Sequence, residues 1–124
     1  MPLYTALMDL VEARTWLLDA SKNQRLAISV ITVTEIAGGM RSGERKHVNR
    51  LLNSMHIFPV SERIAWGAAE LMRKYRRSHS VIGISDYLIA ATALVEGLDL
   101  ITLNIRHFPM FPRLKVPVGN PCSW

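Results

Sequence analysis

One segment constrains this chain more than any other. Residues 85–93 read Ser-Asp-Tyr-Leu-Ile-Ala-Ala-Thr-Ala, an apolar and small-sided helix pattern with one acid near its start. A helix with such small side chains can lie close to a sheet, so Asp86 would stand at a crowded, partly dry edge. An ionised carboxylate is costly there unless it is paired or binds a metal. The alternative is that Asp86 only favours the positive end of the helix dipole.

The composition is that of one ordinary globular domain. The chain has 124 residues, 49% of them hydrophobic and 20% charged, so we expect a single domain, residues 1–124, with its own core. The apolar runs are too short to cross a bilayer, and Asp9 and Glu12 stand in a segment without the basic start of a signal peptide. The lone Cys122 cannot form an internal disulfide. These features predict a cytoplasmic protein with no membrane partner.

The positive charge of the chain favours an anionic partner. The net charge is +5, and basic residues concentrate in the segments 41–50 and 73–77. Nucleic acid and an acidic protein segment are the partners that such a charge attracts. The competing interpretation is that Lys and Arg near helix ends complement the helix dipoles and keep the surface soluble.

Helices and strands are predicted to alternate along the chain. Leucines at helical spacing predict a first helix over residues 6–20, and a short apolar run predicts a buried strand at 26–29. A helix follows from about Thr32 to the Gly38-Gly39 pair. The remaining predicted helices are 45–54, 61–75 and 85–97, and the remaining strands are 57–60, 98–102 and 114–118. This alternation favours the α/β class, with helices around a mostly parallel sheet.

Four oxygen-bearing residues are predicted to share one edge of this sheet. In parallel sheets, ligands collect at the carboxyl ends of the strands. Glu35 and Asp86 fall at helix starts, Asn104 follows a strand, and Asp9 lies near the start of the first helix. Such a cluster suits Mg²⁺ or Mn²⁺, which take oxygen ligands and keep several waters. These ions can activate water and stabilise the charge that develops on a phosphodiester.

Structural explanations compete for two of these residues. Thr32-Val33-Thr34-Glu35 fits a capping box, in which Glu35 bonds back to the cap residue. Asn104 could simply hold a turn. The four histidines show no metal-ligand spacing, and the sequence has neither a glycine-rich phosphate loop nor a nucleophile elbow. The oxygen-bearing set is therefore the best candidate for a site.

Three segments stand in register along the chain, residues 26–35, 83–93 and 100–108, which contain Thr34-Glu35, Ser85-Asp86 and Thr102-Leu103-Asn104. Together these segments resemble the PIN-domain ribonucleases, specifically the VapC-type toxins of bacterial toxin–antitoxin pairs. The resemblance implies a three-layer α/β/α fold, usually a homodimer, with an acidic pocket that binds Mg²⁺ or Mn²⁺. It also implies endonucleolytic cleavage of RNA and inhibition by a cognate VapB-like antitoxin.

The resemblance implies roles for single residues as well. Glu35 matches the acid of an early helix, Asp86 that of a later helix, and Asn104 a position where many members carry Asp and others Asn. These three would be the catalytic, metal-binding residues, and with Asn at the last position the affinity for metal should fall. Ser85 and Thr102 would orient the metal ligands. The phosphates of RNA would be held by a set of basic residues, Arg41, Arg76 and Arg77.

The N-terminal segment departs from the family pattern. Members open with a short apolar strand that ends in an acidic motif, and here the first acid of that motif falls on Leu3. Asp9 matches only a later acid, and so little precedes Leu3 that we expect the first strand to be missing or truncated. Three explanations stay open: a truncated or wrongly started chain, a degenerate toxin completed by a partner's strand, or Asp9 as a substitute metal ligand. The last requires a shift of more than a helical turn.

Three functions are compatible with these observations. The first is a metal-dependent endoribonuclease that hydrolyses RNA phosphodiester bonds. The second is a catalytically impaired PIN-like module that binds antitoxin or RNA without cutting, which Leu3 favours and the presence of Glu35 and Asp86 disfavours. The third is a small α/β interaction protein whose acids are all helix caps, and whose stability would not respond to metal.

Overall fold

A parallel β-sheet forms the centre of the molecule in the computed structural model, which describes residues 6–9, 26–102 and 104–111. Within these residues, four strands pair in the order β3-β2-β1-β4, and all the pairings are parallel. The strands are β1 (Ala6–Asp9), β2 (Leu26–Ser29), β3 (His56–Phe58) and β4 (Asp99–Thr102). The predicted α/β class with a mostly parallel sheet is confirmed.

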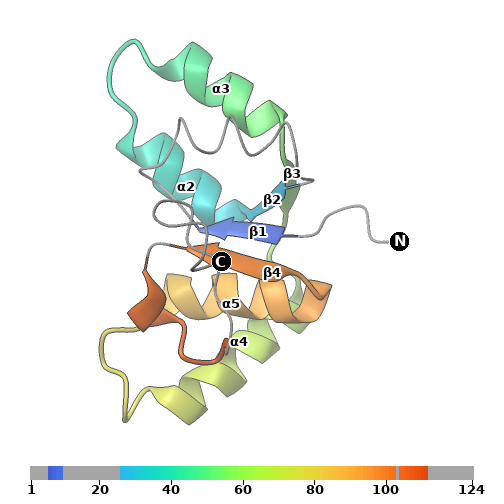
Figure 1. The fold of residues 1–124 in the computed structure, drawn as a ribbon, viewed down its shortest axis with the longest axis vertical. Helices are drawn as coiled ribbons and strands as arrows, with labels where there is room; N and C mark the ends of the chain where they lie inside the picture. The colour runs from blue at the N-terminus through green and yellow to red at the C-terminus, as the bar shows by residue number, and fades with distance from the viewer. Residues whose placement is uncertain (1–5, 10–25, 103, 112–124) are drawn as a thin grey trace, which may run out of the picture.

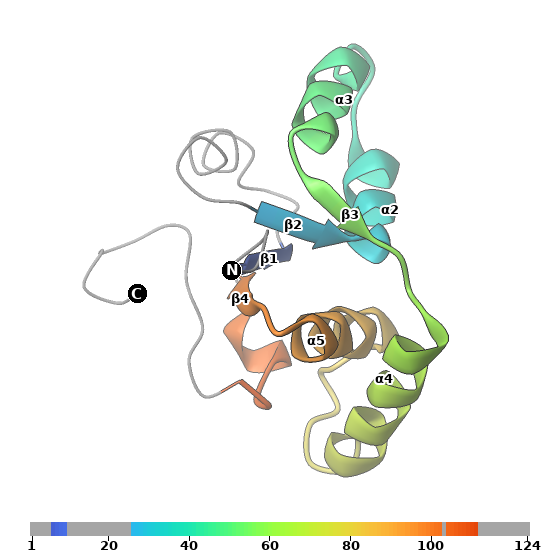
Figure 2. The same ribbon diagram turned by 90° about the vertical axis from the view of Figure 1, so that its right-hand side faces the viewer.

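Helices pack around this sheet. The described part of the chain forms α2 (Val30–Gly39), α3 (Arg45–Asn53), α4 (Glu62–Tyr75), α5 (Ile84–Glu96) and a 3₁₀ turn, η1 (Ile105–His107). In Figure 1, α2 and α3 lie above the strands, and α5 and α4 lie below them. Figure 2 shows α5 next to the strands with α4 outside it, and α5 contacts β1, β4, α2 and α4. None of the helices in the described ranges is both long enough and apolar enough to cross a membrane.

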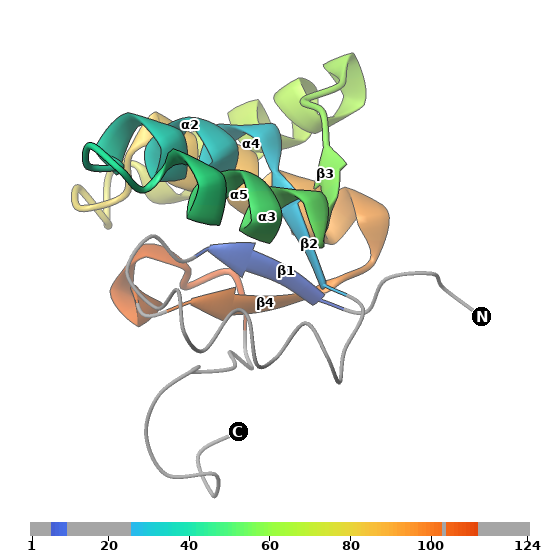
Figure 3. The ribbon, with the colours of Figure 1, turned by 90° about the horizontal axis from the view of Figure 1, so that it is seen from above.

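The first strand corrects our expectation for the N-terminal segment. Residues 6–9 form β1, not the first turn of a helix, and β1 occupies the centre of the sheet where we expected a strand to be missing or truncated. Figure 3 shows β1 side by side with β4, and Leu7 is fully buried. The rest of the predicted helix, residues 10–20, and the predicted strand 114–118 lie outside the described residues.

The cap of α2 lies earlier than the sequence pattern suggested. The helix begins at Val30, because the extended Ser29 at the end of β2 accepts a hydrogen bond from the Ile31 N–H at 3.0 Å. We expected the helix from about Thr32, with Glu35 as the reciprocal partner of a capping box. With Ser29 as the cap, Glu35 lies in the middle of α2, too far along the helix to bond back to the cap. The capping-box interpretation of Glu35 is therefore wrong.

The ends of α4 and α5 fall close to the predicted positions. Ser61 caps α4 by accepting a hydrogen bond from the Ile64 N–H at 3.1 Å, as expected. Gly97 ends α5 with a φ of 68°, a left-handed conformation that glycine adopts without strain. The start of α5 differs, because Gly83 and not Ser85 is the N-cap residue.

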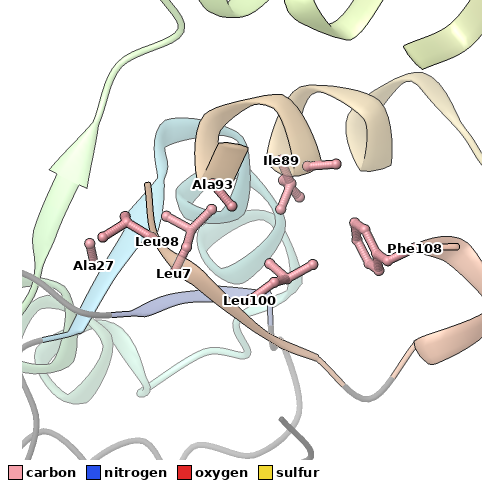
Figure 4. Close-up of a cluster of buried hydrophobic side chains, with 8 residues drawn as sticks. Leu7, Ala27, Ile89, Ala93, Leu98, Leu100 and Phe108 are labelled. Atoms are coloured by element: carbon pink, nitrogen blue, oxygen red, sulfur yellow. The ribbon is translucent and has the colours of Figure 1, made fainter. Parts of the chain in front are cut away.

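Small residues on α5 let this helix lie close to the sheet, as its sequence predicted. Ala90 is completely buried in a cluster with Leu7 of β1 and Leu100 of β4. Figure 4 shows Leu7, Leu100 and Phe108 converging with Ile89 of α5 in this cluster. Phe108 directly follows η1, so its burial holds η1 beside α5.

Candidate active site

The carboxyl ends of three strands meet at one edge of the sheet. Asp9 ends β1 and Thr102 ends β4, and these two residues are partners in the parallel register, while Ser29 ends the neighbouring β2. In Figure 1, the arrowheads of β1 and β4 point to the same side, where α5 begins. We expected Asp9 near the start of a helix, but its backbone instead ends the central strand. This edge is the place where parallel sheets bind ligands.

Asp86 is held at this edge by two hydrogen bonds. Its side chain is 14% exposed and belongs to the first turn of α5. The Oδ2 atom accepts one hydrogen bond from the Gly83 N–H at 3.0 Å and lies 2.9 Å from His107 Nδ1. Asp86 therefore does interact with the start of α5, as one prediction held, but this interaction uses only the Oδ2 atom of its carboxylate. Because both contacts within the described residues use Oδ2, Oδ1 is the oxygen that can meet a ligand.

The negative charge of Asp86 acts on Glu35 across two neighbouring helices. Glu35 is an exposed residue of α2 overall, but its carboxyl is partly withdrawn from water. This burial raises the pKa of Glu35 above its usual value, and the negative charge of Asp86 raises the pKa further. The two residues belong to helices that contact each other, since α2 packs against α5. A cation bound between them would relieve this repulsion.

Asn104 and Thr102 extend the site after β4. Thr102 is fully buried, and its Oγ1 accepts a hydrogen bond from the Asn104 N–H at 2.9 Å. The turn of η1 is closed by the backbone carbonyl of Asn104, which accepts from the His107 N–H at 3.0 Å. The turn predicted as an alternative role for Asn104 is thus made by its backbone, and its exposed amide makes no cap bond. Ser85 is half-buried beside Asp86 in the first turn of α5.

The predicted RNA-binding arginines lie in two different parts of the structure. Burial and the charge of Asp86 raise the pKa of the Tyr87 hydroxyl, and Arg76 partly offsets this shift. Arg76 is the exposed residue that directly follows α4 as its C-cap. Arg77 is exposed next to Arg76, whereas Arg41 lies in the loop beyond the C-terminal end of α2.

His107 is a site residue that we did not predict from the sequence. It contacts Asp86 across 21 positions of the chain, and its side chain is 29% exposed. An ionised carboxylate only accepts hydrogen bonds, so the ring nitrogen is the donor in this contact. No local spacing could reveal the pair, because β4 and the burial of Phe108 bring η1 beside the start of α5. The sequence offered one indication of a role for His107, which is its position shortly after Asn104 in the segment 100–108 that resembles the family.

The donors at this edge fit a hard divalent cation. Within the described ranges, no three side chains of His, Cys, Asp or Glu gather in one cluster, so the described donors are the carboxylates of Glu35 and Asp86 and the amide of Asn104. Mg²⁺ takes few carboxylates and keeps several waters, which agrees with such a set. Thr32, one turn before Glu35 on α2, has a buried hydroxyl without a hydrogen-bond partner among the described residues. An unsatisfied group of this kind costs about 1–3 kcal/mol and is a natural contact for water or a ligand.

Comparison with known proteins identifies the class of this chain. Residues 8–114 match the PIN domain, and the chain belongs to the PIN-domain family. Ribonuclease VapC10 of Mycobacterium tuberculosis is 54% identical over 115 residues, which cover 93% of this chain and 86% of that protein. Ribonuclease VapC19 of the same organism is 40% identical over 97 residues, or 78% of each chain. Within the family, the relatives of this chain are thus VapC-type proteins, as its motifs suggested.

Solved structures share its fold. A toxin–antitoxin complex from Klebsiella pneumoniae has a chain that superposes with a TM-score of 0.70 at 25% identity, covering 94% of this chain and 100% of that chain. A DNA-bound VapBC structure from Salmonella typhimurium gives a TM-score of 0.72 at 19% identity, over 91% and 96% of the two chains. The fold predicted from the resemblance is therefore confirmed.

Proposed function

We propose that this chain is a VapC-type toxin that acts as a metal-dependent endoribonuclease. The observation that carries the proposal is the position of two acids at the carboxyl edge of the parallel sheet, Glu35 on α2, which follows β2, and Asp86 in the first turn of α5, which contacts α2. The 54% identity to a ribonuclease over 93% of the chain supports this reaction. Attack of water on the RNA phosphodiester would leave 5′-phosphate and 3′-hydroxyl ends.

Mg²⁺ or Mn²⁺ is the cofactor that these residues would hold. Glu35, the Oδ1 atom of Asp86 and the amide oxygen of Asn104 are oxygen donors, which hard cations prefer. The bound ion would supply an activated water and stabilise the charge that develops on the phosphate. His107 orients Asp86 for this task through Oδ2, and Thr102 positions the backbone of Asn104.

Asp9 is the residue that we assign to the first acid of the site. It ends the central strand at the same edge, level with Thr102, and the match to the PIN domain begins at residue 8. In the family pattern, the first acid follows a short apolar strand, and β1 is such a strand. An acid at Leu3 is then unnecessary. Of the three explanations for the unusual N-terminal segment, this placement of β1 supports the one in which Asp9 serves as a ligand.

The partners that we propose are RNA, a VapB-like antitoxin and a second copy of the chain. The Klebsiella pneumoniae structure is a toxin–antitoxin complex, which supports an antitoxin partner here. The net charge of +5 suits both RNA and an acidic segment of an antitoxin. The homodimer follows from the family resemblance.

Cleavage of a structured RNA with and without Mn²⁺ tests the proposed function. Three chains are compared: the wild type, Asp86→Asn, and Glu96→Gln as a matched control that removes one negative charge from the exposed far end of the same helix. We expect the wild type and Glu96→Gln to cut RNA only with Mn²⁺. Asp86→Asn should lose about 100-fold or more of the rate, since even groups that only orient metal ligands contribute about 10–100-fold.

Other outcomes separate the alternatives. Equal cleavage by the wild type and Asp86→Asn would exclude the proposed site. RNA binding by the wild type without cleavage would leave the impaired binding module. An unchanged melting temperature across millimolar Mn²⁺, together with no cleavage, would leave the small interaction protein, because a ligand that binds only the folded state must raise stability.

A further inference from the structure

A cavity of about 420 Å³ opens between η1 and the loop that follows α4. Among the described residues, it is lined by the loop 78–81 that follows α4, and by Ile105, Arg106 and Pro109 around η1. In Figure 1, this loop (yellow) and η1 (orange-red) lie on the same side of the molecule, near the start of α5. The proposed catalytic residues do not line this cavity, so it is a separate feature of the surface.

Two consecutive residues of η1 link the cavity to Asp86. Arg106 lines the cavity, and the next residue, His107, contacts Asp86 Oδ2 at 2.9 Å. Consecutive Cα atoms are about 3.8 Å apart, and a 3₁₀ helix has about three residues per turn, so neighbouring side chains leave η1 in different directions. A strand of RNA whose phosphate lies at Asp86 could therefore place an adjoining nucleotide in the cavity.

The walls of the cavity combine apolar and polar chemistry. Val81 is 40% exposed and Ile105 is 50% exposed, and with Pro109 they give the cavity an apolar wall. The guanidinium of Arg106 and the hydroxyls of Ser78 and Ser80 supply polar groups at the same opening. A nucleotide needs both kinds of surface, because its base has flat apolar faces with polar edges and its phosphate pairs with arginine.

His79 is fixed in the wall by two neighbours. Its ring lies edge-on to the Tyr75 ring, with centroids 5.6 Å apart, and its Nδ1 lies 2.7 Å from the Ser78 hydroxyl. The hydrogen bond to Ser78 uses Nδ1 of the His79 ring, and Nε2 is the ring nitrogen that remains for a ligand. A polar group held in place before binding costs less entropy to use than a mobile one.

The charge around the cavity selects an anionic occupant. The loop residues 78–81 directly follow the basic run 73–77 at the C-terminal end of α4, and Arg106 lines the cavity from η1. No Asp or Glu is among the described residues that line the cavity. A phosphate group therefore fits this opening, whereas a metal cation does not.

We propose that this cavity binds one nucleotide of the RNA strand, next to the phosphate that is cut. The base lies against Val81, Ile105 and Pro109, and Arg106 pairs with its phosphate. The substrate class rests on the proposed ribonuclease function, but the binding site does not depend on catalysis. The cavity would then influence which RNA positions are cut, since it holds the nucleotide beside the reacting bond.

The test measures binding of a short single-stranded RNA by fluorescence polarisation, with Asp86→Asn as the background so that the RNA stays intact. Arg106→Ala and Ile105→Asp are added separately to this background. Both side chains are exposed, so their replacement should not unfold the chain. The matched control is Arg63→Ala, which removes an exposed arginine from the far part of α4. We expect each cavity variant to bind RNA about tenfold more weakly, which is the loss typical of one charge-assisted contact. We expect little change in the RNA affinity of the control.

A second measurement places the RNA on the cavity directly. The imidazole resonances of His79 and His56 are followed by NMR as RNA is added to the Asp86→Asn chain, because His56 belongs to β3 and does not line the cavity. We expect the His79 signal to shift and the His56 signal to stay. Equal RNA affinity in the cavity variants and the control, or no RNA binding at all, would overturn the cavity proposal. RNA cleavage by the wild type reports separately on the proposed function, so the two proposals can fail independently.

Discussion

Asp86 combines two tasks in one carboxylate. Its Oδ2 atom closes the start of α5 through the Gly83 N–H and meets His107, while Oδ1 remains for a ligand. The structural explanation of this acid and the functional one are therefore compatible, although the sequence presented them as alternatives. Glu35 is the opposite case, because Ser29 makes the cap and leaves Glu35 without a structural task at the start of α2.

Glu35→Gln should stabilise the metal-free chain at neutral pH. The pKa of Glu35 is raised in the folded state by burial and by Asp86, so the folded chain holds this proton more tightly than the unfolded chain does. Stability is then lost as the pH rises from the unfolded value of about 4.3 through the folded pKa, and the loss persists at higher pH. Thermal melts in chelator should show a higher melting temperature for Glu35→Gln at pH 7, and a smaller difference at pH 4. The same gain at both pH values would contradict the coupling, and Glu96→Gln serves as the control.

His107→Ala should weaken metal-dependent cleavage without unfolding the chain. The substitution removes the donor that orients Asp86, and the side chain is partly exposed, so little core packing is lost. Groups that orient metal ligands contribute about 10–100-fold to metal affinity or activity. The Mn²⁺ concentration that gives half-maximal cleavage should rise by this amount in His107→Ala, and return toward the wild-type value in His107→Gln, which restores a donor. A shift of the same size in His47→Ala would show that the effect is not specific to this contact.

At the scale of elements, the sequence predicted α4, α5 and β4 because each carries its own local signals. Ser61 and Gly97 mark helix ends, and the alanines of α5 predict close packing on the sheet. The prediction for residues 6–9, which form β1, was wrong. A central parallel strand is an uninterrupted apolar run, and Ala6-Leu7-Met8 also fits the helical spacing of the leucines that follow. His107 was missed because its contact with Asp86 exists only once β4 and α5 are assembled.

Close packing of α5 gives a test at the scale of one element. Ala90 is completely buried against the sheet, so Ala90→Leu must push α5 outward or distort its neighbours. Overpacking of this kind costs about 1–3 kcal/mol in the free energy of unfolding. Urea unfolding should show this loss for Ala90→Leu and almost none for Ala69→Leu, which changes an exposed alanine of α4. Similar stabilities of the two variants would mean that α5 does not lie tightly on the sheet.

The whole molecule brings distant parts of the chain to one edge. The end of β1, the middle of α2, the start of α5 and the residues after β4 meet there, although they span positions 9 to 104 of the sequence. The motif positions could be predicted from the sequence, because each follows or opens an element. Their mutual distance could not, because it depends on the strand order β3-β2-β1-β4 with β1 at the centre.

Binding of Mn²⁺, measured by electron paramagnetic resonance, tests most directly whether this edge is a single cation site. Free Mn²⁺ gives a sharp signal that is lost on binding, so the measurement needs no RNA and no catalysis. We predict that the wild type and Glu96→Gln remove Mn²⁺ from solution, and that Glu35→Gln and Asp86→Asn each weaken this binding by about tenfold or more. If all four chains leave the same free Mn²⁺ signal, Glu35 and Asp86 do not form a metal site, and the proposed chemistry is wrong.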